Sequence, residues 1–226
     1  MRCFSTLVQQ SVWAVVIGST VWLSPLIQAA PGDAELGFPN VELVNPGMDI
    51  VVNSTVRQPD GKIIIGGQWH TVSGTIWSGI TRLNTDGTRD VTFKSRVSGT
   101  VSGMALQPDG KLLIWGGFSS VISPAPTFSE TLRNSIARLN SDGSVDTTFE
   151  VTFPGFASIY AAAVQADGKI VFSGYFTQVN GIARTGLARV SSTGVLDAAF
   201  GEHPQDWVFL AVEKKPPYAV GIYFME

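Results

Sequence analysis

The sequence predicts an all-β fold, built as a β-propeller-like array of four-stranded antiparallel blades. Three observations support this fold class: the chain repeats itself, each repeat divides into short apolar or alternating runs, and Asp-Gly turn signals separate those runs. Helical periodicity is absent from the repeats. Glycine is frequent (24 of 226 residues) and only 15% of the residues are charged, a composition that favours a turn-rich β protein.

A first motif, Gln-Pro-Asp-Gly-Lys, marks each repeat. It stands at residues 58–62 and 107–111, and returns as Gln-Ala-Asp-Gly-Lys at residues 165–169. Proline fixes φ near −65°, so Pro59 cannot occupy a turn position that needs a positive φ. The motif therefore predicts a three-residue hairpin loop with Pro and Asp in a type I turn and a left-handed Gly. Seven residues after each Lys stands an aromatic residue: Trp69, Phe118 and Phe176.

A second motif follows in each repeat, Arg-Leu-Asn-x-Asp-Gly with a later Asp-x-x-Phe. It spans residues 82–93 and 138–149, and more loosely residues 189–200. Arg82 and Asp90 are symmetric about the turn, so we expect them to face each other across two strands. Because every copy repeats this pair, we interpret it as a structural latch worth roughly 0.2–1 kcal/mol and not as an anion receptor.

Four short strands in a period of roughly 50 residues are the size of a propeller blade. A solenoid of hairpins is the competing architecture, although its coils are usually shorter. Two outcomes stay open for the ring: an open or incomplete array, or closure in which residues 33–38 and the 207–224 segment form a composite fourth unit. We expect three full copies and one partial copy, at about residues 50–93, 100–149, 158–200 and 207–224.

Residues 1–30 have the layout of a secretory signal peptide. Arg2 is their one charged residue, an apolar run covers residues 12–23, and the small pair Ala29-Ala30 follows. The apolar run has about twelve residues, short of the roughly 20 that span a bilayer, so an uncleaved anchor is the less favoured alternative. The sequence predicts a protein that is secreted or at the cell surface, with no membrane span after cleavage.

Two further segments complete the predicted organisation. A leader covers residues 31–49, and the repeat domain covers residues 50–226. The one cysteine of the sequence, Cys3, lies inside the signal segment, so the exported form would contain no thiol. A cysteine-free chain is compatible with an oxidising compartment.

The motifs taken together resemble the delta-60 repeat family, bacterial repeat proteins of β-propeller type. Residues 58–69 with 82–93, and 107–118 with 136–149, match the family pattern closely, and the third copy matches it loosely. The resemblance implies exported or surface-exposed repeat proteins. It brings no shared catalytic site.

Catalytic and metal-binding patterns are not found in the sequence. The two histidines, His70 and His203, stand outside any Ser-His-Asp order, HExxH motif or phosphate-binding Gly loop. Asn84, Asp86 and Asp90 superficially resemble a calcium loop, but no bidentate acid follows at the required spacing, so turn chemistry explains them better. We expect no catalytic residue, no cofactor and no metal. The net charge of −3 argues against a nucleic-acid partner.

Variable loops opposite the Asp-Gly turns are the favoured place for ligand binding. They carry the candidate contact residues Trp77, Phe128, Phe156 and Trp207. The alternative is that these aromatic side chains pack between neighbouring blades.

The sequence thus predicts an exported, non-catalytic repeat protein that acts as a surface or interaction module, with a protein or a carbohydrate as partner. Two alternatives remain. One is an extracellular hydrolase on a propeller scaffold, and the other is a truncated relative of a larger surface protein.

Overall fold

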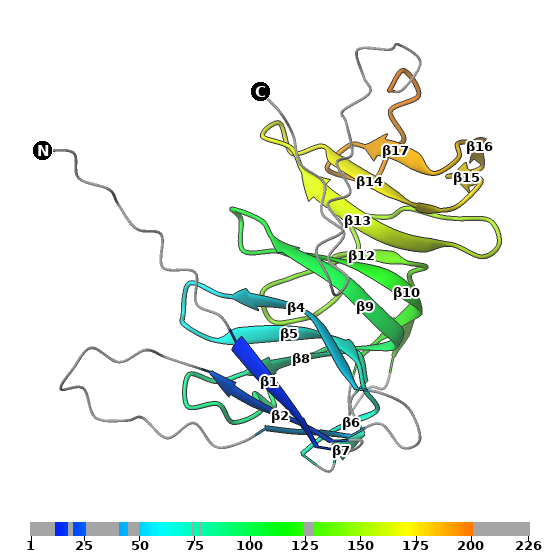
Figure 1. The fold of residues 1–226 in the computed structure, drawn as a ribbon. Helices are drawn as coiled ribbons and strands as arrows, with labels where there is room; N and C mark the ends of the chain where they lie inside the picture. Colours follow the sequence, from blue (N-terminus) through cyan, green and yellow to red (C-terminus); the bar gives the residue numbers. More distant parts are fainter. Residues whose placement is uncertain are drawn as a thin grey trace, which may run out of the picture.

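A computed structural model of the chain describes residues 12–17, 20–25, 41–44, 50–73, 75–76, 78–123 and 129–200. These residues form an all-β structure of short antiparallel sheets (Figure 1). Within the described part, no helix is long and apolar enough to cross a membrane.

Each of the three full copies forms one antiparallel sheet whose second strand lies in the middle. The first copy contains β4 (Val51–Arg57), β5 (Ile63–Gln68) and β8 (Ile80–Leu83). The second contains β9 (Arg96–Leu106), β10 (Leu112–Ile122) and β12 (Ile136–Leu139). The third contains β13 (Ser158–Val164), β14 (Ile170–Tyr175) and β17 (Leu187–Val190).

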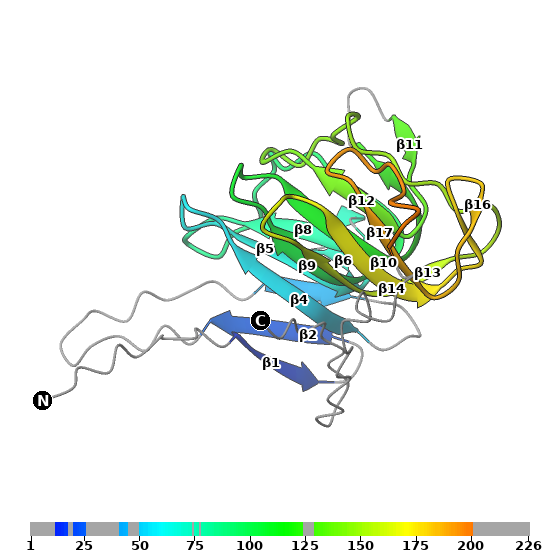
Figure 2. The same cartoon turned by 90° about the horizontal axis from the view of Figure 1, so that it is seen from above.

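Short strands also occur in the loops that were predicted to be variable. They are β6 (Thr71–Val72) with β7 (Thr75–Ile76), β11 (Glu130–Leu132) against the end of β10, and β15 (Gln178–Val179) with β16 (Ile182–Ala183). The segment before the repeats contributes β1 (Val12–Ile17), β2 (Thr20–Pro25) and β3 (Val41–Val44). These three strands join β6 and β7 in one sheet beside the first copy (Figure 2).

The Gln-Pro-Asp-Gly-Lys turn has the predicted conformation. The Gly61 N–H donates to the Gln58 carbonyl at 2.9 Å, and the Gln58 N–H donates to the Lys62 carbonyl at 2.8 Å. Gly61 is left-handed at φ +86°, and the equivalent Gly110 and Gly168 both have φ +81°. A three-residue loop with a left-handed third residue is therefore confirmed in all three copies.

The strand count per blade needs a correction. The fourth run of each copy was expected to be a strand, but it makes only a single bridge, such as Leu83 with Arg89. The chain turns away immediately afterwards, because the Asp90 carboxylate accepts the Thr92 N–H at 2.8 Å and the Phe93 N–H donates to the Asp90 carbonyl at 3.3 Å. Each blade is thus three strands and one bridged segment, to which the middle copy adds β11.

The hydrophobic core lies between successive copies. Phe93, the last residue of the first copy, is buried with Ile64 among side chains of the second copy. Phe149 has the same place between the second and third copies. The motif aromatics Trp69, Phe118 and Phe176 are also buried.

Among the described residues the copies form an open series in which the first packs on the second and the second packs on the third. No closed ring is present in this part of the chain. The composite fourth unit expected from residues 33–38 and 207–224 lies outside the described residues.

Candidate functional site

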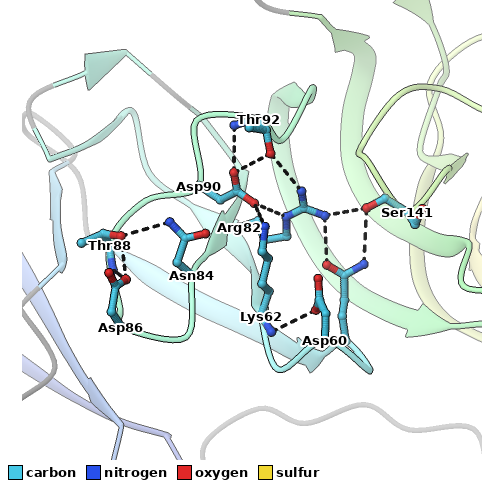
Figure 3. Close-up of polar contacts among 10 residues, drawn as sticks. Asp60, Lys62, Arg82, Asn84, Asp86, Thr88, Asp90, Thr92 and Ser141 are labelled. Carbon is cyan, nitrogen blue, oxygen red and sulfur yellow. Dashed lines mark hydrogen bonds and ion pairs between the residues drawn. The ribbon is translucent and has the colours of Figure 1, made fainter. Parts of the chain in front are cut away.

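The predicted Arg–Asp latch is a buried ion pair that a partly exposed lysine joins as a third charged group (Figure 3). In the first copy the Asp90 Oδ2 atom lies 2.8 Å from Arg82 Nε and 2.7 Å from Lys62 Nζ. The Arg82 guanidinium also lies over the Phe93 ring, 5.0 Å from its centroid. The pairing predicted from the symmetric spacing is confirmed, and the participation of Lys62 is an addition to it. The predicted value of roughly 0.2–1 kcal/mol is too small for the effect of removing one partner, because the Arg82–Asp90 pair is buried.

The carboxylates of this cluster are strongly held in the ionised form. Burial raises the pKa of Asp90, but hydrogen bonds from Lys62 and Thr92 and the charge of Arg82 outweigh burial and hold that pKa well below its ordinary value. The balance is the same at Asp146, where Thr148, Lys111 and Arg138 donate. A carboxylate with so low a pKa is a poor proton donor or acceptor near neutral pH.

The latch also joins neighbouring copies. Arg82 Nη1 donates to the main-chain carbonyl of Ser141 at 2.6 Å, and Arg138 Nη1 donates to the carbonyl of Ser192 at 2.6 Å. The Gln58 side chain adds a longer hydrogen bond to the Ser141 carbonyl, at 3.4 Å. Because the same bond recurs at both junctions, it serves the assembly of the array.

The third copy has a looser latch. Both side chains of the Arg189–Asp197 pair are 22% exposed, against 7% or less for the corresponding pairs of the first two copies. Lys169 Nζ lies 3.6 Å from Asp197, which is longer than the 2.7 Å at Asp90. Burial raises the pKa of Asp197, but the hydrogen bond and charge of Arg189 lower it overall.

The candidate ligand residue that the structure describes is Phe156. Its side chain is 77% exposed and its ring centroid lies 5.9 Å from that of Tyr175, which is 57% exposed. The alternative of packing between blades is therefore wrong for Phe156. The other three candidates, Trp77, Phe128 and Trp207, lie outside the described residues.

A third exposed aromatic residue, Tyr160, occupies a β-bulge. The first strand of every copy carries one unpaired residue at the same point, between Val52 and Ser54 in the first copy and between Ile159 and Ala161 in the third. A bulge re-aims the side chain of its extra residue. Tyr160 is 53% exposed.

Sequence reasoning missed Tyr160 and Tyr175, although a comparison of the copies contains the signal. Where the third copy has Tyr160, the second copy has Ser102 and the first has Asn53. Where the third copy has Tyr175, the second copy has Gly117 and the first has Gln68. Phe156 of the third copy corresponds to Ser98 of the second. We call Phe156, Tyr160 and Tyr175 the third-copy aromatic surface. Phe156 and Tyr175 are in ring contact at the end of β13 and β14 opposite their Asp-Gly-Lys turn, and Tyr160 stands in the nearby bulge of β13.

A separate cavity of about 520 Å³ lies between the second and third copies. Its lining includes Met104, Trp115, Ala162 and Val164, and it carries no titratable side chain. Trp115 replaces Gly66 and Ser173 of the other copies, and its indole N–H donates to the Tyr160 carbonyl at 3.4 Å. The lining also includes Gln107 and Gln165, so the cavity offers apolar and amide contacts but no acid, base or nucleophile.

In the portion of the chain that the structure describes, no three His, Cys, Asp or Glu side chains come together as a metal site.

Comparison with known proteins identifies the repeats. A family model described as a domain of unknown function (DUF5122) β-propeller matches residues 58–93, 107–149 and 165–200, just over half of the chain. A crystal structure of a protein of unknown function from Bacteroides caccae is similar at 12% sequence identity over 79% of this chain and 73% of that chain, with a TM-score of 0.27. No curated protein matches. The matched segments lie within the three copies, each from the first turn to the final Phe, and the chain belongs to the DUF5122 β-propeller family.

Proposed function

We propose that the chain is an exported, non-catalytic repeat protein of the delta-60 type, and that it acts as an interaction module at the cell surface. The observation that carries this proposal is the third-copy aromatic surface. Three exposed aromatic rings stand at positions where the earlier copies have small or polar residues.

A repeat array distinguishes residues that serve the fold from residues that do not. Features present in every copy, such as the latch and the left-handed turn glycines, maintain the blades. Phe156, Tyr160 and Tyr175 are not needed for that purpose, because the first two copies form the same sheet and the same bulge without them. Phe156 and Tyr175 lie against each other, and large exposed apolar groups that are gathered together are typical of a contact surface.

The chemistry of the surface favours a protein or a carbohydrate as partner. Aromatic rings supply a large contact area at a small cost in side-chain entropy, and tyrosine adds a hydroxyl group for hydrogen bonding. Hot-spot tyrosines of protein interfaces typically contribute about 2 kcal/mol or more on truncation.

The absence of a catalytic role is supported by the state of the buried carboxylates. Asp90 and Asp146 are each engaged by an arginine, a lysine and a threonine, so neither is poised for proton transfer. Export is supported by the composition of residues 1–30.

The test exchanges third-copy residues for their second-copy counterparts. The double variant Phe156→Ser/Tyr175→Gly would be compared with the parent chain for binding to a glycan array and to immobilised cell-envelope proteins. We expect binding to fall at least tenfold, which is about 1.4 kcal/mol.

A matched control is available in the same copy. Val195 is also exposed, but it lies by the second turn, away from the aromatic surface. The variant Val195→Thr, which introduces the residue of the first copy, should bind like the parent chain. Equal binding by the double variant and the parent would overturn the assignment of this surface.

A further inference from the structure

The cavity between the second and third copies has small side chains in its walls. They belong to Ala105, Ala162 and Val164. At the first junction the corresponding positions carry larger side chains, those of Val56, Met104 and Leu106. The second junction therefore has space where larger side chains pack the first. Its volume of about 520 Å³ lies in the range of ligand sites, roughly 300 to 1,000 Å³.

Trp115 supplies a fixed apolar wall of this cavity. The residue is 9% exposed, and a Cβ placed on Gly103 would lie 2.3 Å from its ring, so the indole lies across the backbone of the neighbouring strand. The indole N–H already donates to the Tyr160 carbonyl at 3.4 Å. Trp115 therefore offers a ligand the apolar surface of its ring and no free donor.

Gln107 brings a buried acceptor to the cavity. In the first copy the equivalent Gln58 accepts a hydrogen bond through Oε1 from Arg82 Nη1, at 3.1 Å. Gln107 lines the cavity, and its buried Oε1 accepts no hydrogen bond in the part of the chain that the structure describes. Leaving a buried carbonyl oxygen without a donor is unfavourable, so an O–H or N–H group of a ligand would be stabilised there.

The lining also indicates the charge of the ligand and its way in. Among the described residues that form it, none has a charged side chain. Met104 and Trp115 are buried, whereas Pro108 and Ala166, in the first turns of the two copies, are exposed. The cavity is thus reached from the side of these turns. An uncharged ligand is favoured, because an unpaired charge is costly away from water.

We infer that this cavity binds a small, uncharged aromatic molecule that carries a hydroxyl or N–H group. Its ring packs against the Trp115 indole, because contacts between aromatic rings add to the gain from apolar burial. Its donor binds Gln107 Oε1. The inference goes beyond the proposed function, since Phe156 and Tyr175 of the third-copy aromatic surface are exposed and are not part of the cavity lining.

Calorimetric titration of the full chain with naphthol tests the inference. The matched probe is methoxynaphthalene, which keeps the fused rings and loses the O–H donor. Naphthol should bind about tenfold more tightly than methoxynaphthalene, the ratio expected from one net hydrogen bond. No binding of naphthol, or equal binding of the two probes, would overturn the inference.

A pair of variants separates ligand binding from a structural role. Gln107→Leu removes the unpaired oxygen, so it should weaken naphthol binding about tenfold and leave both methoxynaphthalene binding and the urea midpoint unchanged. Gln58→Leu is the matched control. It removes the hydrogen bond with Arg82, so it should lower the urea midpoint and leave naphthol binding unchanged. A lower midpoint with unchanged binding for Gln107→Leu would assign Gln107 a structural role and overturn the inference.

A third variant tests the location of the site. Ala162→Met introduces the corresponding residue of the second copy into the cavity, and it should abolish binding of both probes. A variant that keeps its circular dichroism spectrum and binds naphthol like the parent chain would overturn the location. These outcomes are separable from failure of the proposed function, because the test with Phe156→Ser/Tyr175→Gly uses glycans and envelope proteins as probes and does not depend on the cavity.

Discussion

Arg82 of the first copy and Ser141 of the second are joined by a 2.6 Å hydrogen bond from Nη1 to the main-chain carbonyl. The same guanidinium binds the Asp90 carboxylate through Nε at 2.8 Å. The ion pair inside one blade therefore orients the group that attaches the next blade. Folding of a copy and its docking are coupled through one side chain.

Removing the carboxylate of the buried latch should be costly. Asp90→Ala leaves Arg82 buried without its counter-ion, and loss of one partner of a buried pair typically costs about 3 to 5 kcal/mol. Asp197→Ala, in the partly exposed latch of the third copy, should cost about 1 kcal/mol or less. Urea unfolding followed by circular dichroism measures both losses. Equal losses for the two variants would contradict the difference in burial.

The first hairpin turn should tolerate only residues that accept a left-handed conformation. A Cβ at Gly110 would meet no atom within 4 Å, so Gly110→Val is opposed by its φ of +81° alone and should cost about 1 kcal/mol or more. Gly110→Asn should cost less, because asparagine enters this region more readily. Thermal unfolding gives the comparison, and an unchanged melting temperature for Gly110→Val would refute the turn assignment.

The second turn should be less tolerant than the first. A Cβ at Gly143 would lie 2.8 Å from the Phe93 ring, at the end of the preceding copy, and 2.8 Å from the nitrogen of Lys94, which follows it. Gly143→Val therefore adds a clash at the junction to the backbone strain of φ +89°. Its melting temperature should fall further than that of Gly110→Val. The reverse order would argue against tight packing at this junction.

Acid should destabilise the fold through the latch carboxylates. The folded-state pKa values of Asp90 and Asp146 lie well below the unfolded value of about 3.9. Their contribution to the free energy of unfolding is therefore complete above that value. It is lost as the pH falls toward the folded pKa, and it amounts to about 1.4 kcal/mol for each unit by which the pKa is lowered. Unfolding free energies measured at neutral pH and at about pH 3 should show the loss, and Asp90→Ala should reduce it. A fold that gains stability in acid would contradict this prediction.

Expression in a secretion-competent host tests the predicted export. The chain should be recovered outside the cytoplasm, shortened by about thirty residues at its N-terminus. Intact mass measurement locates the cleavage. A full-length chain recovered from the cytosol would show that residues 1–30 are not a signal peptide.

The parts of the fold that depend on local sequence could be predicted. The loop at Gly61 follows from the proline two residues earlier and from the glycine itself, and the register of Arg82 with Asp90 follows from symmetry about a tight turn. Both features recur in three copies of the same motif, and equivalent residues of the copies adopt the same conformation. Those are short-range constraints.

The remaining features depend on side-chain hydrogen bonds, contacts between copies and bulges, which the sequence of a single motif does not reveal. The prediction of a fourth strand was wrong because the Asp90 carboxylate accepts a hydrogen bond from the Thr92 N–H. This bond turns the chain and competes with strand pairing. The bond from Arg82 to Ser141 joins residues far apart in the sequence, and its acceptor is a main-chain atom that any residue would supply. The exposure of Tyr160 depends on a bulge, and the strand alternation does not reveal where the bulge falls.

The use of main-chain carbonyls at the junctions has an evolutionary consequence. An arginine that binds the Ser141 or Ser192 carbonyl requires no particular side chain in the copy that receives it. A gene duplication that adds a blade, or a deletion that removes one, therefore creates a junction that already has its principal hydrogen bond, with no compensating substitution on the accepting side. The length of such an array can change during evolution by whole units, while the residues exposed on each unit diverge independently.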